Sequence, residues 1–93
     1  MLFRSSAIKC FIVNGILAGD KREDGNSTQQ AAYEAKARES FEIATKAGNA
    51  LGYTGTRINE DFGLAQSSET PRLVNDGAYF KRTATMCKSL GLM

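Results

Sequence analysis

Residues 2–17 read LFRSSAIKCFIVNGIL, and this stretch decides the fold class that the sequence predicts. From Ile8 to Val13 the side chains alternate along the chain and β-branched residues are frequent, a pattern typical of extended structure. Asn14-Gly15 is a strong two-residue hairpin signal. The return arm Ile16–Ala18 is short, so residues 1–18 are expected to form one strand or a short hairpin.

A helix is predicted over residues 27–47. Ser27 has the side chain of an N-cap, and Gln30 three residues later completes a capping box. Gly48 is expected to cap the other end. Small and aromatic residues recur at spacings of three and four, on a stripe formed by Tyr33, Ala37, Ser40, Ala44, Ala47 and Leu51. Because alanine buries little area, this helix needs large side chains from the element against which it packs.

The segment 48–72 shows neither helical nor strand periodicity in its apolar residues. Four glycines interrupt it, and Pro71, the only proline of the chain, lies at its end. We therefore expect an irregular connection. Irregular segments of this length are uncommon in small domains and usually serve a function.

A second helix is predicted over residues 75–90. Asn75 or Asp76 can cap its start, and Gly91 can end it. Every charged side chain after Asp76 is basic, so this helix combines a broad apolar surface with a basic edge. Together these elements predict an α+β fold in one small domain, residues 1–93: a strand or short hairpin, then two amphipathic helices joined by a long irregular segment.

Composition argues against catalysis. The 93 residues include no histidine, which removes the commonest general base and zinc ligand. The remaining carboxylates lie in polar, glycine-containing stretches and form no recognisable catalytic or metal-binding pattern. We expect no enzyme activity, no catalytic or metal-binding residues and no cofactor.

Cys10 and Cys87 lie near opposite ends of the chain and leave two alternatives open. A disulfide between them would close most of the chain and stabilise it. The interpretation we favour is two ordinary buried thiols, since free cysteine packs as a small hydrophobe. A reactive thiol would need a lowered pKa, and no histidine is present to activate one.

Charge and hydropathy bear on location and partners. Residues 1–19 contain Arg4, Lys9 and two serines but no acid, a bias typical of organelle transit peptides. We expect an intracellular protein, with an organelle as a candidate compartment. No apolar stretch reaches the length of about 20 residues that a bilayer requires. With 12 basic against 10 acidic residues, nucleic acid is an unlikely partner.

The favoured hypothesis is a non-catalytic structural or linker subunit that binds other protein subunits within a larger complex. The alternative is a small nucleic-acid-binding module that uses the basic, aromatic C-terminal helix. The sequence identifies neither the partner nor the oligomeric state. The residues expected to contact a partner are Tyr53, Phe62, Tyr79, Phe80, Arg82, Leu90, Leu92 and Met93.

Two stretches carry a resemblance to a known family. The run from Ala78-Tyr79-Phe80-Lys81-Arg82 to Lys88-Ser89-Leu90-Gly91 resembles the final helix of small phycobilisome linker polypeptides, and Leu2-Phe3-Arg4 resembles their opening strand. The Gly-Gly-Lys-Ile strand that follows that helix in the family has no counterpart before Met93. The resemblance implies a linker role in a photosynthetic complex.

Overall fold

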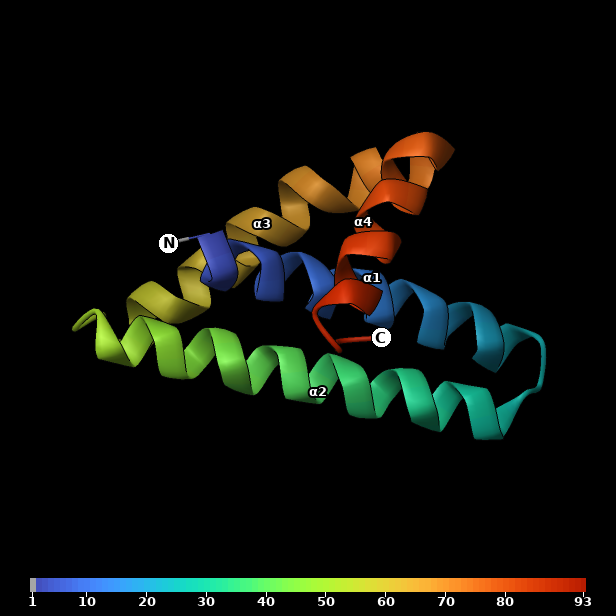
Figure 1. Cartoon of the computed structure of the whole chain (residues 1–93), viewed down its shortest axis with the longest axis horizontal. Helices are drawn as coiled ribbons and strands as arrows, with labels where there is room; N and C mark the ends of the chain where they lie inside the picture. The colour runs from blue at the N-terminus through green and yellow to red at the C-terminus, as the bar shows by residue number, and fades with distance from the viewer. Residues whose placement is uncertain (1) are drawn as a thin grey trace.

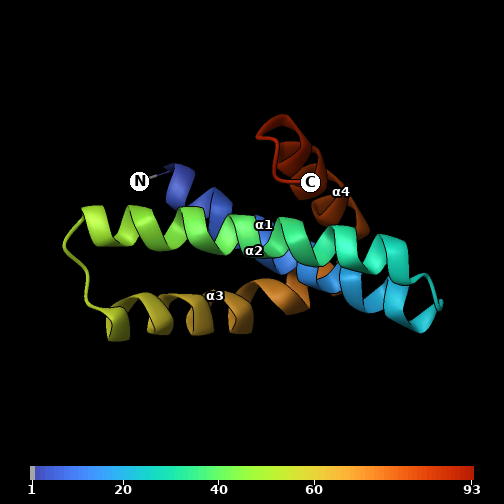
Figure 2. The same cartoon turned by 90° about the horizontal axis from the view of Figure 1, so that it is seen from below.

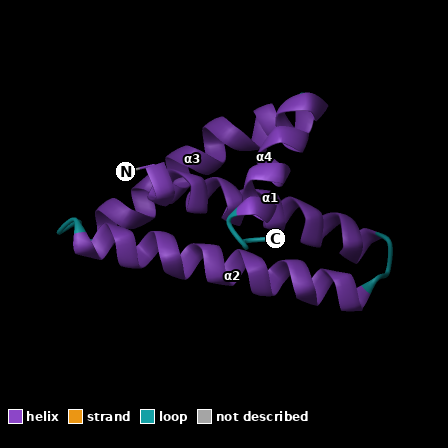
Figure 3. Ribbon diagram, viewed as in Figure 1, coloured by secondary structure: helices purple, strands orange, loops and turns teal. Residues whose placement is uncertain are grey.

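The computed structural model describes residues 2–93, with side chains from Arg4 onward. The chain forms four helices: α1 (Leu2–Glu23), α2 (Ser27–Ala50), α3 (Gly55–Asn75) and α4 (Gly77–Ser89). Within this range there is no strand (Figure 3). The fold is all-α, so the predicted α+β class is wrong.

Helix α1 is the centre of the structure. It lies along α2 over most of its length (Figure 1), and it also contacts α3 and α4. Seen from below, α3 and α4 lie on opposite sides of α1 (Figure 2). Three different helices therefore cover three sides of α1.

This central position explains why residues 1–18 were predicted to be extended. A helix covered on several sides is apolar nearly all round, and a short continuous apolar run does not distinguish a buried helix from a buried strand. Ala7, Ile8, Cys10 and Val13 are all buried, although they point in different directions around α1. The Asn14-Gly15 pair lies inside the helix, not in a turn.

Helix α2 confirms the helix predicted over residues 27–47. Its buried face is Ala37, Ser40, Ala44 and Gly48, as the stripe of small residues indicated. The cap is one residue earlier than expected, since the Asn26 side chain accepts a hydrogen bond from the backbone N–H of Gln29 at 3.0 Å.

Gly48 is a packing residue and not the predicted C-cap. The helix continues to Ala50, and the positive φ that ends it belongs to Gly52, at 81°. A Cβ atom at Gly48 would lie 2.9 Å from Cγ1 of Ile58 on α3. The absence of a side chain at Gly48 therefore makes room on α2 for the Ile58 side chain of α3.

The segment predicted to be irregular contains α3. Thr54 caps this helix by accepting a hydrogen bond from the N–H of Arg57 at 3.1 Å. The side chains that face inward follow helical spacing: Ile58, Phe62, Ala65, Glu69 and Leu73. Because Glu69 is charged, the helical period of the apolar residues is interrupted and is not visible in the sequence. Pro71 lies inside the last turns and cannot donate the helical hydrogen bond to residue 67.

Three aromatic rings join α1, α2 and α3. The ring centroid of Phe11 lies 5.3 Å from that of Phe62 and 5.7 Å from that of Phe41, and Phe41 lies 4.8 Å from Phe62. Aromatic pairs at these distances add about 0.5–1.5 kcal/mol each beyond the burial of their area. The large side chains that the alanine face of α2 requires thus come from both neighbouring helices.

Helix α4 confirms the second predicted helix. Asp76 caps it by accepting a hydrogen bond from the N–H of Tyr79 at 3.0 Å. Gly91 ends it with φ of 73°, and the N–H of Leu92 bonds back to the carbonyl of Cys87 at 2.8 Å. This pattern is a Schellman motif, which turns the last two residues back towards the other helices.

Cys10 and Cys87 form a disulfide between α1 and α4. The favoured interpretation of two unpaired buried thiols is therefore wrong. Both cysteines are fully buried, as expected, but their Cα atoms are 5.7 Å apart, within the range that a disulfide bridges. The contact depends on the crossing of α1 and α4, which the sequence pattern did not reveal.

Candidate interaction surface

Three of the eight residues predicted to bind a partner belong to the core of the chain itself: Phe62, Tyr79 and Leu92. Phe62 is 6% exposed and Leu92 is 1% exposed. Phe62 belongs to the aromatic cluster, and Leu92 is placed by the Schellman turn after α4. Neither side chain is available to a partner while this fold persists.

Tyr53 is half-buried between two arginines. The guanidinium carbon of Arg57 lies 4.2 Å from the centroid of its ring, and that of Arg4 lies 5.1 Å away. Both arginines also bond Asp61, with Arg4 Nη2 at 2.8 Å from Oδ2 and Arg57 Nε at 3.4 Å from Oδ1. This cluster ties α1 to α3 and to the α2–α3 turn, so its role is structural.

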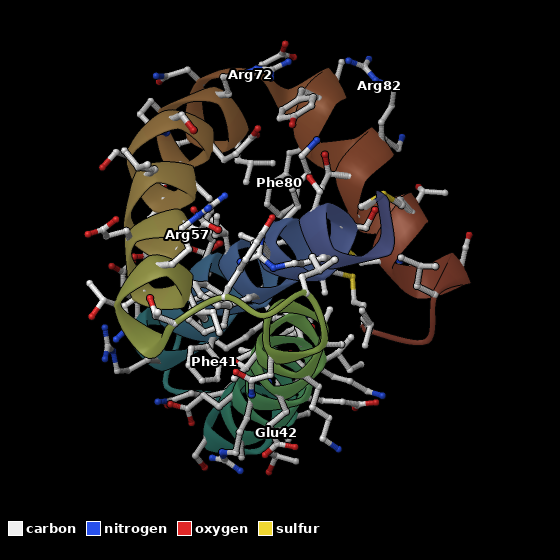
Figure 4. All side chains as sticks on the ribbon, turned by 90° about the vertical axis from the view of Figure 1, so that its left-hand side faces the viewer. Phe41, Glu42, Arg57, Arg72, Phe80 and Arg82 are labelled. Carbon is white, nitrogen blue, oxygen red and sulfur yellow. A yellow bond between two sulfur atoms is a disulfide. The ribbon has the colours of Figure 1, made fainter. Side chains whose placement is uncertain are left out.

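Tyr79 is also occupied within the chain. Its hydroxyl donates to Oε2 of Glu69 at 2.6 Å, and the guanidinium carbon of Arg72 stacks 4.0 Å from its ring centroid. Arg82 approaches the same ring at 5.9 Å and remains exposed, and Figure 4 shows Arg72 and Arg82 at the outer edge of the molecule. The ring is buried, so it offers no stacking platform for a base.

Phe80 lines a groove where α3 turns into α4 across α1. This part of the groove has a volume of about 320 Å³ and is bordered by Ile16, Asp20, Leu73, Val74, Gly77 and Phe80. Val74 is 64% exposed, which is unusual for a β-branched apolar side chain beside a core. Among the predicted contact residues, Phe80 is the one that lines this groove.

The groove continues between α1 and α3. A second part of about 220 Å³ shares Ile16 with the first and is lined by Phe11, Ile12, Gly15, Ile16, Gln66 and Thr70. At Gly15 and at Gly19, one helical turn later, an added Cβ would meet no atom within 4 Å. This edge of α1 therefore has room for another backbone to lie close to it.

The charge of the groove is acidic. Among the described residues that line its two parts, Asp20 alone is charged. It lies in the last turn of α1, while Leu73 and Val74 lie in the last turn of α3. The Asp20 carboxylate favours a cation there, while the negative dipole ends of α1 and α3 are opposed by the positive end of α4, which begins at Gly77 in the same groove.

The remaining predicted residues lie away from the groove. Leu90 is 38% exposed at the end of α4, and Met93 is half-buried against the core. Arg82 belongs to the outer face of α4, beside an open hollow of about 450 Å³ lined by Ala78, Lys81, Arg82 and Thr85. The structure thus distributes the eight residues over the core, two arginine–tyrosine clusters, the groove and the tail.

Sequence reasoning missed Ile16, Asp20 and Val74. Ile16 was assigned to a hairpin arm, and Asp20 and Val74 lie between the predicted elements. A helical reading of residues 2–23 would have placed Ile12, Ile16 and Asp20 on one edge, because they follow at intervals of four. No local signal indicates that α3 passes this edge.

Residues 2–93 show neither a metal-binding cluster nor a membrane-spanning helix. They contain no group of three or more acidic or cysteine side chains arranged to hold a metal ion. None of their helices has the length and apolar character needed to cross a bilayer.

Comparison with protein-family models, curated proteins and solved structures found no match to this chain. The Leu2-Phe3-Arg4 stretch that resembles the opening strand of phycobilisome linkers lies in α1, which is a helix.

Proposed function

We propose that this chain is a non-catalytic subunit that binds another protein and helps to hold a larger assembly together. The observation that carries the proposal is the apolar groove that α1 forms with α3 and α4. Ile16, Val74 and Phe80 are large apolar side chains that remain partly or largely exposed there. Contiguous exposed apolar surface of this kind is typical of protein-binding sites.

The occupant that best fits the groove is an amphipathic helix of the partner. Gly15 and Gly19 leave room for a helix backbone to approach at the lower end of the usual 8–10 Å separation. Apolar side chains spaced three and four residues apart can then contact Ile16 and Val74 together. A lysine or arginine on the same helix would complement Asp20, which is exposed at one end of the groove.

The disulfide supports one proposal about the compartment. Disulfides persist in oxidising environments and are rare in the reducing cytosol. The Cys10–Cys87 bond therefore favours an oxidising compartment, and the lumen of an organelle is one such setting.

The nucleic-acid alternative receives less support. It needs exposed aromatic rings beside the basic residues of α4. Tyr79 is buried beneath Arg72, and Phe80 packs against the core. Lys81, Arg82 and Lys88 remain exposed, but Phe80 lines the groove beside Asp20, whereas Lys81 and Arg82 line a separate hollow.

Site-specific photo-crosslinking followed by charge exchange tests the proposal. A photoreactive phenylalanine analogue at Val74 is expected to crosslink one protein, which mass spectrometry identifies. The same analogue at Glu42, which is exposed on α2 away from the α3–α4 corner (Figure 4), is the matched control. Asp20→Lys should weaken binding, and reversing the contacting cation of the identified partner should restore it.

Several outcomes would overturn the proposal. Equal crosslinking from Glu42 and Val74 would indicate nonspecific contact. If Val74 crosslinks only to a second copy of the chain, or only to nucleic acid, then the partner is not the other protein that we propose. Unchanged binding by Val74→Glu would remove the groove from the interface.

A further inference from the structure

We propose that formation of the Cys10–Cys87 disulfide completes the groove, so that the chain binds its partner only after oxidation. The inference rests on the proposed function, because it concerns the regulation of the same groove. Gly77 and Phe80 supply one wall of the groove, and both belong to α4, the helix that the disulfide attaches to α1. Displacement of α4 would dismantle that wall.

Helix α4 is attached to α1 and α3 by a small set of noncovalent contacts and by one covalent bond, the disulfide. Its buried face consists of Tyr79, Thr83 and Cys87, four residues apart. The hydroxyl of Thr83 bonds the carbonyl of Tyr79 at 2.9 Å, within α4 itself, and so makes no bond to another helix. Tyr79 bonds Glu69 on α3, and Phe80, Ala84 and Met86 add partly buried contacts, so the disulfide is the one covalent bond among several attachments of α4.

The tail after α4 is fastened by polar contacts. Nδ2 of Asn14 donates to the carbonyl of Leu92 at 2.7 Å, and Nζ of Lys36 donates to the carbonyl of Gly91 at 3.0 Å. The first bond is buried and the second is exposed. These contacts position the tail, but they require α4 to be in place because the Schellman turn at Gly91 directs the tail.

The other three helices have a core of their own. Phe11, Phe41 and Phe62 join α1, α2 and α3 without any atom of α4. The Arg4–Asp61 ion pair adds a second connection between α1 and α3. Loss of the disulfide should therefore release α4 and leave the remaining helices folded.

The redox step is thiol–disulfide exchange with a disulfide oxidant such as oxidised glutathione. The thiolate of one cysteine attacks the oxidant, forms a mixed disulfide and expels one glutathione thiolate. The thiolate of the other cysteine then attacks the protein sulfur of that mixed disulfide and expels the second. Two cysteine thiols are oxidised, one glutathione disulfide is reduced to two thiols, and their two protons are conserved.

Loop closure sets the expected size of the effect. The bond joins residues separated by 77 positions. Because α1–α3 stay folded, reduction frees only the stretch from the α3–α4 turn to Cys87, about ten residues, and closing a loop of that length corresponds to about 10²-fold in the equilibrium between attached and released α4. Reduction should therefore let α4 detach from α1 more often, so that its backbone amides lose protection from hydrogen exchange.

Amide hydrogen exchange of the full chain, oxidised and then reduced by excess dithiothreitol, tests the inference. In the reduced chain, exchange in residues 77–93 should be up to roughly 10²-fold faster, while exchange in α2 changes by less than about tenfold. Oxidised glutathione should restore protection. A Cys10→Ala/Cys87→Ala variant should behave like the reduced chain, and Asn59→Ala, an exposed substitution on α3, should not.

Two results would overturn the inference. Equal protection of α4 in both redox states would show that noncovalent contacts suffice to hold it. Loss of protection in all four helices would show that the disulfide supports the whole fold and does not gate the groove. Both readouts concern the chain alone, so they stand whether or not crosslinking from Val74 supports the proposed function.

Discussion

The side-chain amide of Asn14 donates a hydrogen bond to the backbone carbonyl of Leu92, 78 residues later, with 2.7 Å between Nδ2 and the oxygen. The same nitrogen donates to the carbonyl of Cys10 at 2.9 Å. Asn14 is fully buried in the middle of α1. One polar side chain inside the central helix thus attaches the C-terminal tail to the core.

Replacement of Asn14 should destabilise the chain. Asn14→Ala leaves the buried carbonyl of Leu92 without a donor, and the expected loss in the free energy of unfolding is about 1–3 kcal/mol. Asn14→Asp should cost more, because a carboxylate would then face two carbonyl oxygens. Urea unfolding measures both changes, with Asn59→Ala on the surface of α3 as the control. A loss in Asn14→Ala no larger than in Asn59→Ala would contradict the role assigned to this bond.

Gly48→Ala should force α2 and α3 apart. The added Cβ would lie 2.9 Å from Cγ1 of Ile58, and overpacking of this kind costs about 1–3 kcal/mol. Gly63→Ala on α3 is the matched control, because its Cβ meets no atom within 4 Å and should stabilise the helix by about 0.5–1 kcal/mol. Thermal unfolding of the two variants should move the melting temperature in opposite directions. A shift of the same sign in both would argue against close contact at Gly48.

Phe62→Ala should be the most destabilising of these substitutions. Phe62 touches the rings of both Phe11 and Phe41, and its removal opens a cavity shared by three helices. The expected cost is about 3–5 kcal/mol. Leu64→Ala, two residues away and 70% exposed, is the control and should stay within about 0.5 kcal/mol. Similar denaturation midpoints for the two variants would contradict the aromatic cluster.

Asp61→Asn should loosen the N-terminal turns of α1. The Arg4 side chain is 12% exposed, so its guanidinium depends on Asp61 for charge compensation. A loss of about 1.5–3 kcal/mol is expected for a hydrogen bond to a charged group. Hydrogen exchange should accelerate near Arg4, whereas Glu60→Gln, an exposed neighbour, should leave it unchanged. Identical exchange in both variants would indicate that Arg4 is held mainly by Tyr53.

Sequence reasoning succeeded where local interactions decide the conformation. The helix predicted from residue 27 was recognisable from its cap and its stripe of small residues, and the last helix from Asp76 and Gly91. It failed for α3, because Glu69 occupies a position of the inward stripe and is satisfied by Tyr79, a residue of another helix. A charged residue on a buried stripe is acceptable only when a distant partner is present.

The candidate groove was predicted only in part. Phe80 was recognised from its place in a basic, aromatic helix, whereas Ile16 and Val74 were not. Their proximity requires α3 to cross α1, and no spacing along the chain encodes that crossing. The same holds for the predicted contacts Phe62 and Leu92, which the fold uses in its own core.

The sequence indicated the helical state of α2 and α4 and the two ends of α4, Asp76 and Gly91, because side chains within a few residues of a helix end supply those signals. It also determined the lack of histidine chemistry. It misplaced both caps of α2, at Ser27 and Gly48. Only the tertiary structure decided that residues 2–23 form a helix, since an apolar run buried on three sides has no period to read. It likewise decided that Cys10 meets Cys87, because that contact forms where two helices far apart in sequence cross.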